Sequence, residues 1–250
     1  MPTPHTKNKK NKLRWKRILL KLSGETLGGS GKFGIDVAAT EYIAREIKEV
    51  VELGCEVAIV IGGGNLIRGS KLADMGIDRP TADTMGMLGT MINGLALQSA
   101  LEHTGMRTHV MSAIMAIQVA EPYTRIRACD HLDKGRVVVL AGGTGNPYFT
   151  TDTAAALRTS EIKAEVLLKA TSVDGVYTAD PRINKNAKLL PTLDPRDMLD
   201  QNLRVMDLTA ATLSIESNTP IVVFNVFRKG NLRRLVLGEK IGSEIRSKKK

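Results

Sequence analysis

A short apolar segment followed by three consecutive glycines constrains this chain more than any other feature. Residues 58–61, Ala-Ile-Val-Ile, are rich in β-branched side chains, which is typical of a strand covered on both faces of a sheet. The glycines at 62–64 lack Cβ atoms, so the backbone can turn sharply and bring its N–H groups against a phosphate. Arg68 then adds a planar positive group. The segment predicts a buried strand that ends in an anion-binding loop, although three glycines alone would also fit a plain turn.

The same design recurs later in the chain. A Val-rich strand over residues 136–141 runs into a glycine-rich stretch at 142–145, and residues 150–152 begin a helix. A helix N-terminus offers unpaired N–H groups and a positive dipole end, so this is a second predicted anion site. Asp152 would repel a phosphate, and we therefore expect it to orient lysines or to cap the helix.

Two further predicted strands each contain a lysine among apolar residues. Lys21 lies in residues 17–23 and Lys169 in residues 165–171. One such lysine would fit an edge strand whose side chain reaches solvent. Two of them indicate a concentrated negative charge between them, at the carboxyl ends of parallel strands where open α/β sheets bind ligands.

The remaining pattern predicts one α/β domain of alternating strands and helices. Asp36 is a predicted N-cap for a helix reaching about residue 53. A second helix, introduced by residues 80–83 and ending near 103, is apolar nearly all round, which favours burial on more than one side and a subunit interface. Asp83 either caps this helix or faces the same site as Arg68. Further strands are expected at 106–112 and 220–226, and further helices at 121–133, 196–201, 207–217 and 230–237.

Charge is concentrated at the ends of the chain. The formal net charge is +10, but 11 of the 36 Lys and Arg residues lie in residues 1–17 and 246–250, and the other 25 nearly balance 26 acidic residues. We expect a basic disordered arm over residues 1–15, a single domain over 16–245 and a basic tail over 246–250. Nucleic-acid binding through these arms is the alternative from a different functional class, but no aromatic-studded basic face accompanies them.

Other residue types exclude several classes of function. Cys55 and Cys129 are far apart, which favours a reducing compartment without disulfides, and the four histidines show no metal-ligand spacing. No apolar segment is long enough to span a membrane and no signal peptide is evident, so we expect a cytoplasmic protein. Gly29, Gly31 and Gly34 match a dinucleotide fingerprint, but they do not lie in the strand-to-helix turn that a Rossmann dehydrogenase requires.

Phosphoryl transfer needs a phosphate cradle, positive charge at the transferring group and an acceptor held in line, and this chain has all three kinds of part. Residues 64–71 are not a Walker A motif, because Ser and Lys stand in the wrong order. Five segments together resemble the amino acid kinase family, over nearly everything from residue 16 to 245: KLSGE (21–25), VIGGGNLIRG (60–69), GTGNPYFTTD (143–152), LLKATSVDGVYTADP (167–181) and VMDLTA (205–210).

The resemblance implies a three-layer αβα sandwich with a largely parallel central sheet. It implies transfer of the γ-phosphoryl group of ATP to UMP, with UMP bound by the N-terminal half and ATP by the C-terminal half. The residues implied for UMP are Gly63, Asp83, Thr144, Gly145, Asn146, Pro147, Tyr148, Phe149, Thr150 and Thr151, with Asp83 accepting from the ribose hydroxyls. Those implied for ATP are Lys21, Leu22, Ser23, Gly24, Gly64, Arg68, Thr171, Tyr177 and Asp180, with Tyr177 near the base.

The catalytic residues implied by the resemblance are Lys21, Arg68 and Lys169, which neutralise the transferring group, and Asp152, which orients the lysines. It further implies Mg²⁺ held mainly by the nucleotide phosphates, with no protein metal site, and a homohexamer that GTP activates and UTP inhibits. The nearest alternative is a member of the same family that phosphorylates a carboxylate or a carbamate.

Overall fold

The computed structural model describes residues 12–31, 33–68, 72, 75–200, 203 and 205–246. Within these residues a nine-stranded sheet has the order β4-β3-β5-β2-β1-β6-β8-β9-β7. The strands are parallel from β4 to β8, and β9 runs antiparallel to β8. Their bounds are β1 (Arg17–Leu22), β2 (Glu56–Ile61), β3 (Thr108–Ser112), β4 (Glu121–Pro122), β5 (Val137–Ala141), β6 (Val166–Thr171), β7 (Thr192–Leu193), β8 (Ile221–Asn225) and β9 (Ser243–Ile245).

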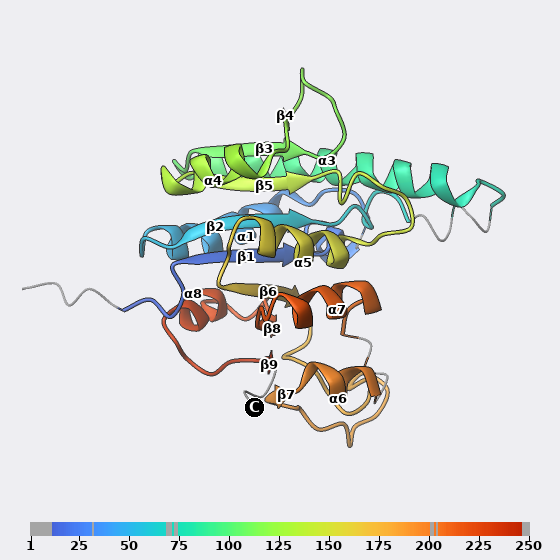
Figure 1. Cartoon of the computed structure of the whole chain (residues 1–250), viewed down its shortest axis with the longest axis vertical. Helices are drawn as coiled ribbons and strands as arrows, with labels where there is room; N and C mark the ends of the chain where they lie inside the picture. The colour runs from blue at the N-terminus through green and yellow to red at the C-terminus, as the bar shows by residue number, and fades with distance from the viewer. Residues whose placement is uncertain are drawn as a thin grey trace, which may run out of the picture.

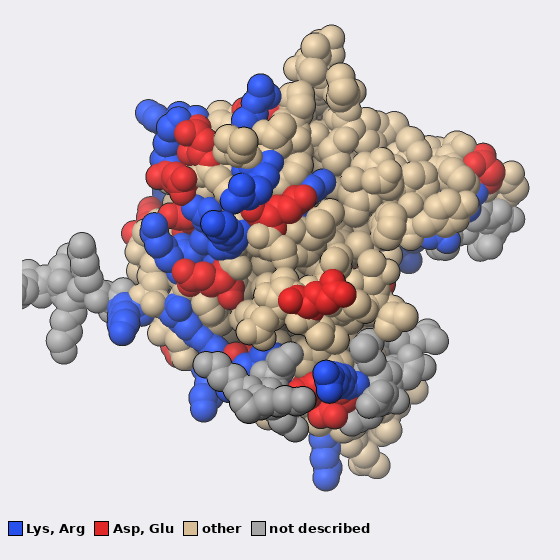
Figure 2. All heavy atoms as spheres, viewed as in Figure 1, with Lys and Arg blue, Asp and Glu red and all other residues tan. Residues whose placement is uncertain are grey.

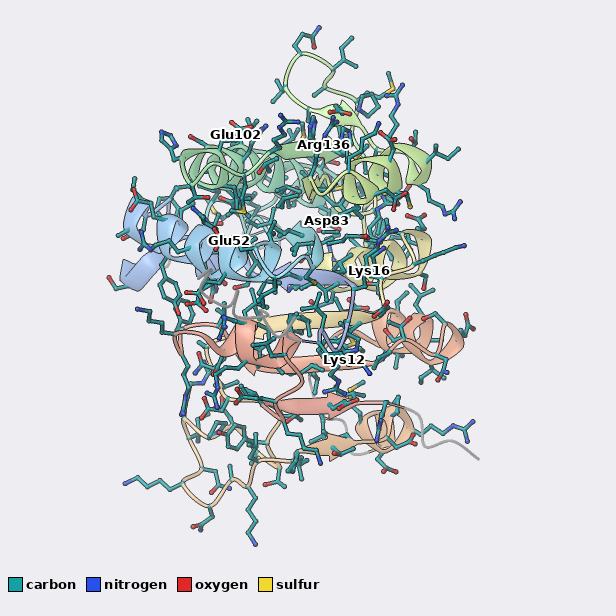
Figure 3. All side chains as sticks on the ribbon, turned by 90° about the vertical axis from the view of Figure 1, so that its left-hand side faces the viewer. Lys12, Lys16, Glu52, Asp83, Glu102 and Arg136 are labelled. Carbon is teal, nitrogen blue, oxygen red and sulfur yellow. The ribbon has the colours of Figure 1, made fainter. Side chains whose placement is uncertain are left out.

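Helices cover both faces of this sheet (Figure 1). The α-helices are α1 (Val37–Val51), α3 (Arg79–His103), α4 (Arg125–Asp133), α5 (Thr151–Glu161), α6 (Pro195–Asp200), α7 (Leu208–Glu216) and α8 (Asn231–Val236). Two short 3₁₀ turns, Gly24–Thr26 and Gly29–Gly31, lie between β1 and α1. In Figure 3, α1 (blue) lies on one side of the sheet and α7 (red) on the other. The chain is therefore the αβα sandwich that we predicted.

Alternation along the strands divides the apolar core between these two faces. In β1, Leu20 and Leu22 pack with α1, α3 and α8, whereas Leu19 packs on the opposite face with α4, α5 and α7. Successive side chains of a strand point to opposite faces, so Lys21 shares the face of Leu19 and α5. Because β1 lies between β2 and β6, the edge-strand explanation for Lys21 is wrong.

Helix starts follow the predicted caps in one case and differ in another. Asp36 caps α1 by accepting from the backbone N–H of Ala39 at 2.8 Å, as predicted. The cap of α3 is Asp78, which accepts from Thr81 N, and Pro80 occupies the first turn. The interpretation of Asp83 as an N-cap is therefore wrong, since Asp83 lies inside the helix, one turn after its start.

Three other elements differ from the sequence prediction. The helix expected at 121–133 begins only at Arg125, because Glu121–Pro122 forms β4 beside β3 and Thr124 is the cap. The short strands β7 and β9 were not predicted. Two or three residues carry too little periodicity to reveal a strand, and pairing with β8 and with each other stabilises them.

The ends of the chain were assigned to basic arms. Residues 1–11 and 247–250 lie outside the described residues. At the inner edge of the predicted arm, however, Trp15 is buried and Arg14 forms an ion pair with Glu244 at 2.8 Å. None of the described helices is long and apolar enough to cross a membrane.

Candidate active site

Lys21, Lys169 and Asp152 form a buried charged cluster, here called the lysine cluster. Lys21 and Lys169 are direct partners in the parallel register of β1 and β6, so two ammonium groups lie on neighbouring strands. Asp152, in the first turn of α5, lies between them, with Oδ1 2.7 Å from Lys21 Nζ and Oδ2 2.5 Å from Lys169 Nζ. Each of the three side chains is at most 14% exposed. Asp152 thus supplies part of the negative charge predicted between the two lysines. It does not cap α5, because the N-cap of that helix is Thr150.

Burial and the neighbouring opposite charge act in opposite directions on the pKa values of Asp152 and Lys169. Burial disfavours the ionised carboxyl and acts to raise the pKa of Asp152, but the two ammonium groups outweigh it and hold that pKa below its usual value. For Lys169 burial prevails and lowers the pKa of the ammonium, although Asp152 opposes this shift. Asp152 therefore stays ionised at neutral pH, and the cluster carries two basic groups for one acid.

A cavity of about 570 Å³, here called the Tyr177 cavity, opens beside Lys169. Lys169 Nζ donates to the backbone oxygen of Val205, and Val205 lines this cavity. Three of the residues predicted for ATP, namely Thr171, Tyr177 and Asp180, lie in the same wall. The Tyr177 cavity therefore adjoins the lysine cluster on the β6 side.

A second cavity of about 310 Å³, here called the Asp83 cavity, lies on the α3 side. It brings together residues from three separate segments that were predicted to bind either substrate. They are Gly63, Gly64, Arg68, Asp83, Phe149, Thr150 and Thr151. Asp152 directly follows Thr151, so the lysine cluster connects the two cavities at the carboxyl ends of the strands.

The outer surface differs between the two ends of the sheet. Figure 2 shows Lys, Arg, Asp and Glu interspersed mainly toward the left, where the parallel strands of Figure 1 begin. The right side, toward which those strands run, carries fewer charged residues and is hollowed. On the face shown, positive and negative side chains are mixed among the described residues, which does not favour a nucleic-acid interface.

The loop after β2, here called the first glycine loop (residues 62–65), is held by close backbone packing. A Cβ on Gly62 would lie 2.9 Å from Gly24 N, and one on Gly63 would lie 2.6 Å from Gly86 O of α3. A Cβ on Gly64, by contrast, would meet no atom within 4 Å. Gly64 therefore faces open space at the cavity wall, where a ligand can approach the backbone.

The loop after β5, here called the second glycine loop (residues 142–145), depends on backbone dihedrals. Gly142, Gly143 and Gly145 have φ values of 75°, 58° and 80°, which side chains other than glycine rarely allow. Gly142 N donates to Thr90 Oγ1 of α3 at 2.7 Å. Both glycine loops are thus fixed against the same helix.

The segment between this loop and α5 carries the other residues predicted for UMP. Thr144 Oγ1 accepts from Asn146 N at 3.2 Å, which closes a local turn. Tyr148 has a φ of 71°, and its backbone N–H donates to Asp83 Oδ2 at 2.8 Å. Thr144, Gly145, Asn146, Pro147 and Tyr148 do not line the Asp83 cavity, but the Tyr148 contact ties their segment to its wall.

Arg68 and Asp180 make exposed ion pairs outside the lysine cluster. Arg68 pairs with Glu25, which follows Gly24 in the turn after β1. Asp180 pairs with Arg182 in the Tyr177 cavity at 2.9 Å, and this guanidinium lowers the pKa of Asp180. Exposed pairs exchange readily with water, so both arginines are available to an incoming anion. The structure does not bring Arg68 into contact with either lysine among the interactions of the described residues.

The other predicted donor-site residues surround the start of the first turn. Leu22 is fully buried with its side chain in the core, so only its backbone can serve a ligand. Ser23 Oγ lies 3.0 Å from Thr26 Oγ1. Gly24 packs directly on Asn65 and Gly64.

Sequence reasoning missed the residues that support this site from behind. Asp207 caps α7 by accepting from Ala210 N at 2.8 Å, and it also accepts from the hydroxyls of Thr150 and Thr153 at the start of α5. Its place in the VMDLTA segment was a signal, since an Asp before an apolar run is a usual cap. Thr90 carried no signal within its apolar helix.

Two of the histidines come together with a carboxylate away from the site, a grouping that their spacing in the sequence did not indicate. His109, Glu121 and His131 come together from β3, β4 and α4, with ligand atoms within 4.8 Å of one another. Arg136 Nη1 lies 3.1 Å from His131 Nδ1, and a guanidinium only donates, so Nδ1 accepts and Nε2 carries the proton shared with Glu121. The nitrogen lone pair of His131 that a metal would need is therefore in use in this arrangement.

Two remaining features lie outside the site. A cavity of about 710 Å³ contains Arg14, Trp15 and Glu244 and none of the predicted site residues. Cys55 is buried and Cys129 is half-buried, and both are free thiols, in agreement with the sequence prediction.

Comparison with known proteins decides the family. A model of the amino acid kinase family matches residues 16–225. The chain belongs to the amino acid kinase family. The UMP kinase of Bacillus anthracis is 43% identical to it, with 94% of this chain and 97% of that chain covered and a TM-score of 0.91.

Two further members of the family are similar over nearly their whole length. The UMP kinase of Ureaplasma parvum is 36% identical, covers 94% of this chain and 100% of its own, and has a TM-score of 0.88. The uridylate kinase of Archaeoglobus fulgidus is 29% identical, with 91% and 99% covered and a TM-score of 0.71. The family and the sandwich fold predicted from the sequence are therefore confirmed.

Proposed function

We propose that this chain is a nucleoside monophosphate kinase that transfers the γ-phosphoryl group of ATP to UMP, giving ADP and UDP. One observation carries the proposal: the lysine cluster lies between two cavities, so positive charge is available where two phosphate-bearing ligands would meet. The similarity to UMP kinases at 43% and 36% identity over 94% of the chain supports UMP as the acceptor.

The Asp83 cavity is the proposed acceptor site. Asp83 already accepts from Arg79 Nε at 2.7 Å and from Tyr148 N, which leaves its other carboxylate oxygen for the ribose hydroxyls. Gly63 supplies its backbone N–H group, and residues 144–151 surround the phosphate and base. The N-terminus of α5, with Thr150 and Thr151 in the cavity wall, favours an anion there.

The Tyr177 cavity is the proposed donor site. Thr171, Tyr177 and Asp180 line it. In the proposed complex Tyr177 lies near the base, and Thr171 and Asp180 serve the rest of the ATP molecule. Residues 21–24, Gly64 and Arg68 then serve the β- and γ-phosphates. In this arrangement the N-terminal half of a single domain over residues 16–245 binds UMP and the C-terminal half binds ATP.

The reaction needs charge neutralisation more than proton transfer. The attacking oxygen of a nucleoside monophosphate is already anionic at neutral pH, so no strong general base is required. Lys21, Lys169 and Arg68 stabilise charge on the transferring group and reduce the repulsion between two polyanions. Asp152 fixes both ammonium groups in place before the substrates arrive, so they need not reorganise during the reaction.

Mg²⁺ is the proposed cofactor, held mainly by the phosphates of ATP. The carboxylates near the site fit this arrangement. Asp152 is already neutralised by two lysines and Asp180 by Arg182, so the phosphates remain the main oxygen ligands for the ion. When bound, the ion would withdraw charge from the β- and γ-phosphates.

Assembly, regulation and location follow from the family resemblance. We propose a homohexamer, activated by GTP and inhibited by UTP, that acts in pyrimidine nucleotide biosynthesis in the cytoplasm. Leu88, Ile92 and Leu95 form an exposed apolar row on α3, which supports self-association. Light scattering of the purified protein, and assays with each effector, test these points.

The deciding experiment is an acceptor assay. The purified chain is incubated with MgATP and UMP, CMP, glutamate or carbamate in turn, and ADP and phosphorylated product are measured. We expect UDP formation from UMP to be fastest. Turnover with glutamate or carbamate only would refute the proposal in favour of the other branch of the family.

The nucleic-acid alternative is tested by truncation. Removing residues 1–11 and 247–250 spares Arg14 and Trp15, which pack on the domain. We expect this variant to keep its kinase activity. Salt-sensitive nucleic-acid binding that disappears on truncation, without any kinase activity in the whole chain, would support the alternative.

A further inference from the structure

Helix α3 contacts both glycine loops through its inward-facing side, a role that its apolar sequence pattern did not predict. Its residues Gly86, Thr90 and Asn93 follow one another at helical spacing, three or four apart, on one side of the helix. Thr90 and Asn93 are at most 2% exposed. The opposite side carries the exposed row Leu88, Ile92 and Leu95.

Thr90 uses its hydroxyl in two directions. Oγ1 donates to Met87 O within the helix at 2.7 Å and accepts from Gly142 N at 2.7 Å. The second bond fixes the peptide group that enters the second glycine loop, at a residue whose φ is 75°. Without this acceptor the N–H of Gly142 would be buried and unpaired, which the loop can relieve only by moving.

Asn93 performs the corresponding task for the first glycine loop. Its Nδ2 donates to Gly62 O at 2.7 Å and to Asn65 Oδ1 at 2.6 Å, and Asn65 Nδ2 returns a bond to Asn93 Oδ1 at 3.1 Å. Asn65 Nδ2 also donates to Gly34 O at 2.6 Å. The amide pair therefore joins α3 to the first glycine loop and to the segment that precedes α1.

Close packing adds to these bonds. A Cβ on Gly63 would lie 2.6 Å from Gly86 O and 3.0 Å from Thr90 N, so the loop backbone rests directly on the helix backbone. The first glycine loop, the second glycine loop and α3 thus form one rigid unit behind the Asp83 cavity.

We propose that α3 positions the phosphate-binding loops, with Thr90 as a positioning residue for the second glycine loop and Asn93 for the first glycine loop. The inference rests on the proposed function, because it assigns the second glycine loop to UMP and the first glycine loop to both substrates, through Gly63 for UMP and Gly64 for ATP. Thr90 acts through Gly142 and Asn93 acts through Gly62. Since misplacement of a reacting group by about 1 Å can cost 10²-fold in rate, such residues affect catalysis without touching the reacting atoms.

The test uses a matched pair of threonines. Thr159 on α5 is also buried, and its Oγ1 donates to Ala155 O within the helix at 2.6 Å. Among the described residues this hydroxyl accepts no hydrogen bond from a loop, unlike the hydroxyl of Thr90. Thr90→Val and Thr159→Val each remove one hydroxyl at constant volume. Thr90→Ser keeps the Oγ acceptor and is the rescue variant.

We expect Thr90→Val to raise the KM for UMP about tenfold, with the KM for ATP changed by less than about twofold. Thr90→Ser and Thr159→Val should keep both constants within about twofold of the parent chain. Asn93→Ala should raise the KM for both substrates, because the first glycine loop that Asn93 holds carries Gly63 for UMP and Gly64 for ATP.

The outcomes separate this inference from the proposed function. Absence of UMP phosphorylation by the parent chain would contradict the proposed function. Normal constants in Thr90→Val, or equal effects of Thr90→Val and Thr159→Val, would overturn the positioning role while the function stands. If thermal melting shows that Thr90→Val does not fold, the same comparison between Thr90→Ala and Thr90→Ser decides.

Discussion

The first and second glycine loops look alike in sequence, since each follows a Val- or Ile-rich strand and contains three glycines within four residues. Their backbones differ. In the first loop, Gly62 and Gly63 leave no space for a Cβ, because neighbouring backbone atoms lie within 3 Å of its position. In the second loop, Gly143 has only a Met87 side-chain atom nearby, at 3.7 Å, but its φ is 58°. Gly63 in the first loop is therefore required for close approach, whereas Gly143 in the second loop is required for conformation.

The charged residues that follow the two loops differ in exposure and in the burial of their ion-pair partners. Arg68, after the first loop, is 43% exposed and pairs with an equally exposed Glu25. Asp152, after the second loop, is 14% exposed and pairs with two buried lysines. The comparison separates a preorganised charge from one that can exchange partners. It indicates that stability depends on Asp152, whereas Arg68 can act on a ligand without supporting the fold.

Replacing Asp152 should have the largest effect on stability. Asp152→Asn leaves two buried ammonium groups without their counter-charge, which typically costs about 3–5 kcal/mol. Urea unfolding at neutral pH measures the loss. Asp133→Asn is the control, because Asp133 pairs with Arg17 but its side chain is 65% exposed, and we expect a change below about 1 kcal/mol. Equal losses in both variants would contradict the distinction.

Replacing Arg68 should affect activity and leave stability unchanged. Arg68→Ala removes a cation from the Asp83 cavity wall, and we expect kcat to fall by about 10²-fold or more with a stability change within about 0.5 kcal/mol. Arg45→Ala on α1 removes an arginine of similar exposure from an ion pair far from the site and should change neither quantity. Near-normal turnover in Arg68→Ala would contradict the proposed catalytic role of Arg68.

Substitution at Gly63 tests the close approach in the first loop. Gly63→Ala forces its methyl group against the backbone of α3 and should destabilise the chain by about 1–3 kcal/mol. Gly64→Ala meets no atom and should stay within about 0.5 kcal/mol of the parent chain, while it raises the KM for ATP. Urea unfolding of both variants distinguishes them. The interpretation fails if the two glycines are equally sensitive.

Substitution at Gly143 tests the conformational requirement in the second loop. Gly143→Ala should cost about 1–2 kcal/mol, because a residue with a Cβ is strained in the left-handed region. Gly143→Asn should cost less than Gly143→Ala, since Asn adopts this region more readily, despite being larger. Thermal unfolding measures both losses. A larger loss in Gly143→Asn than in Gly143→Ala would indicate that the size of the side chain, and not the backbone φ, limits substitution at this position.

The smallest expected effect is a partial loss of stability in acid. Because the folded pKa of Asp152 is lowered, its ionised form stabilises the fold fully above the unfolded pKa of about 3.9, and this contribution is lost as pH falls through the folded value. The stability difference between the parent chain and Asp152→Asn should therefore be constant from pH 5 to 7 and shrink below about pH 4. A difference that already shrinks between pH 7 and 5 would contradict a lowered pKa.

Much of this molecule was determined by local sequence. The β-branched runs before each glycine loop, the Asp36 cap and the helices that follow are short-range patterns, and the structure contains them at nearly the expected residues. The two lysines within apolar strands also pointed to a shared site, because a buried positive charge requires a partner wherever the strand lies.

Only the tertiary structure decided which residues meet. The register of β1 against β6 sets Lys21 beside Lys169, and the packing of α5 on that face brings Asp152 between them. The attachment of both glycine loops to Thr90 and Asn93 likewise depends on where α3 crosses the sheet. Such contacts join residues far apart in the chain, and no local pattern encodes the register or the crossing position that creates them.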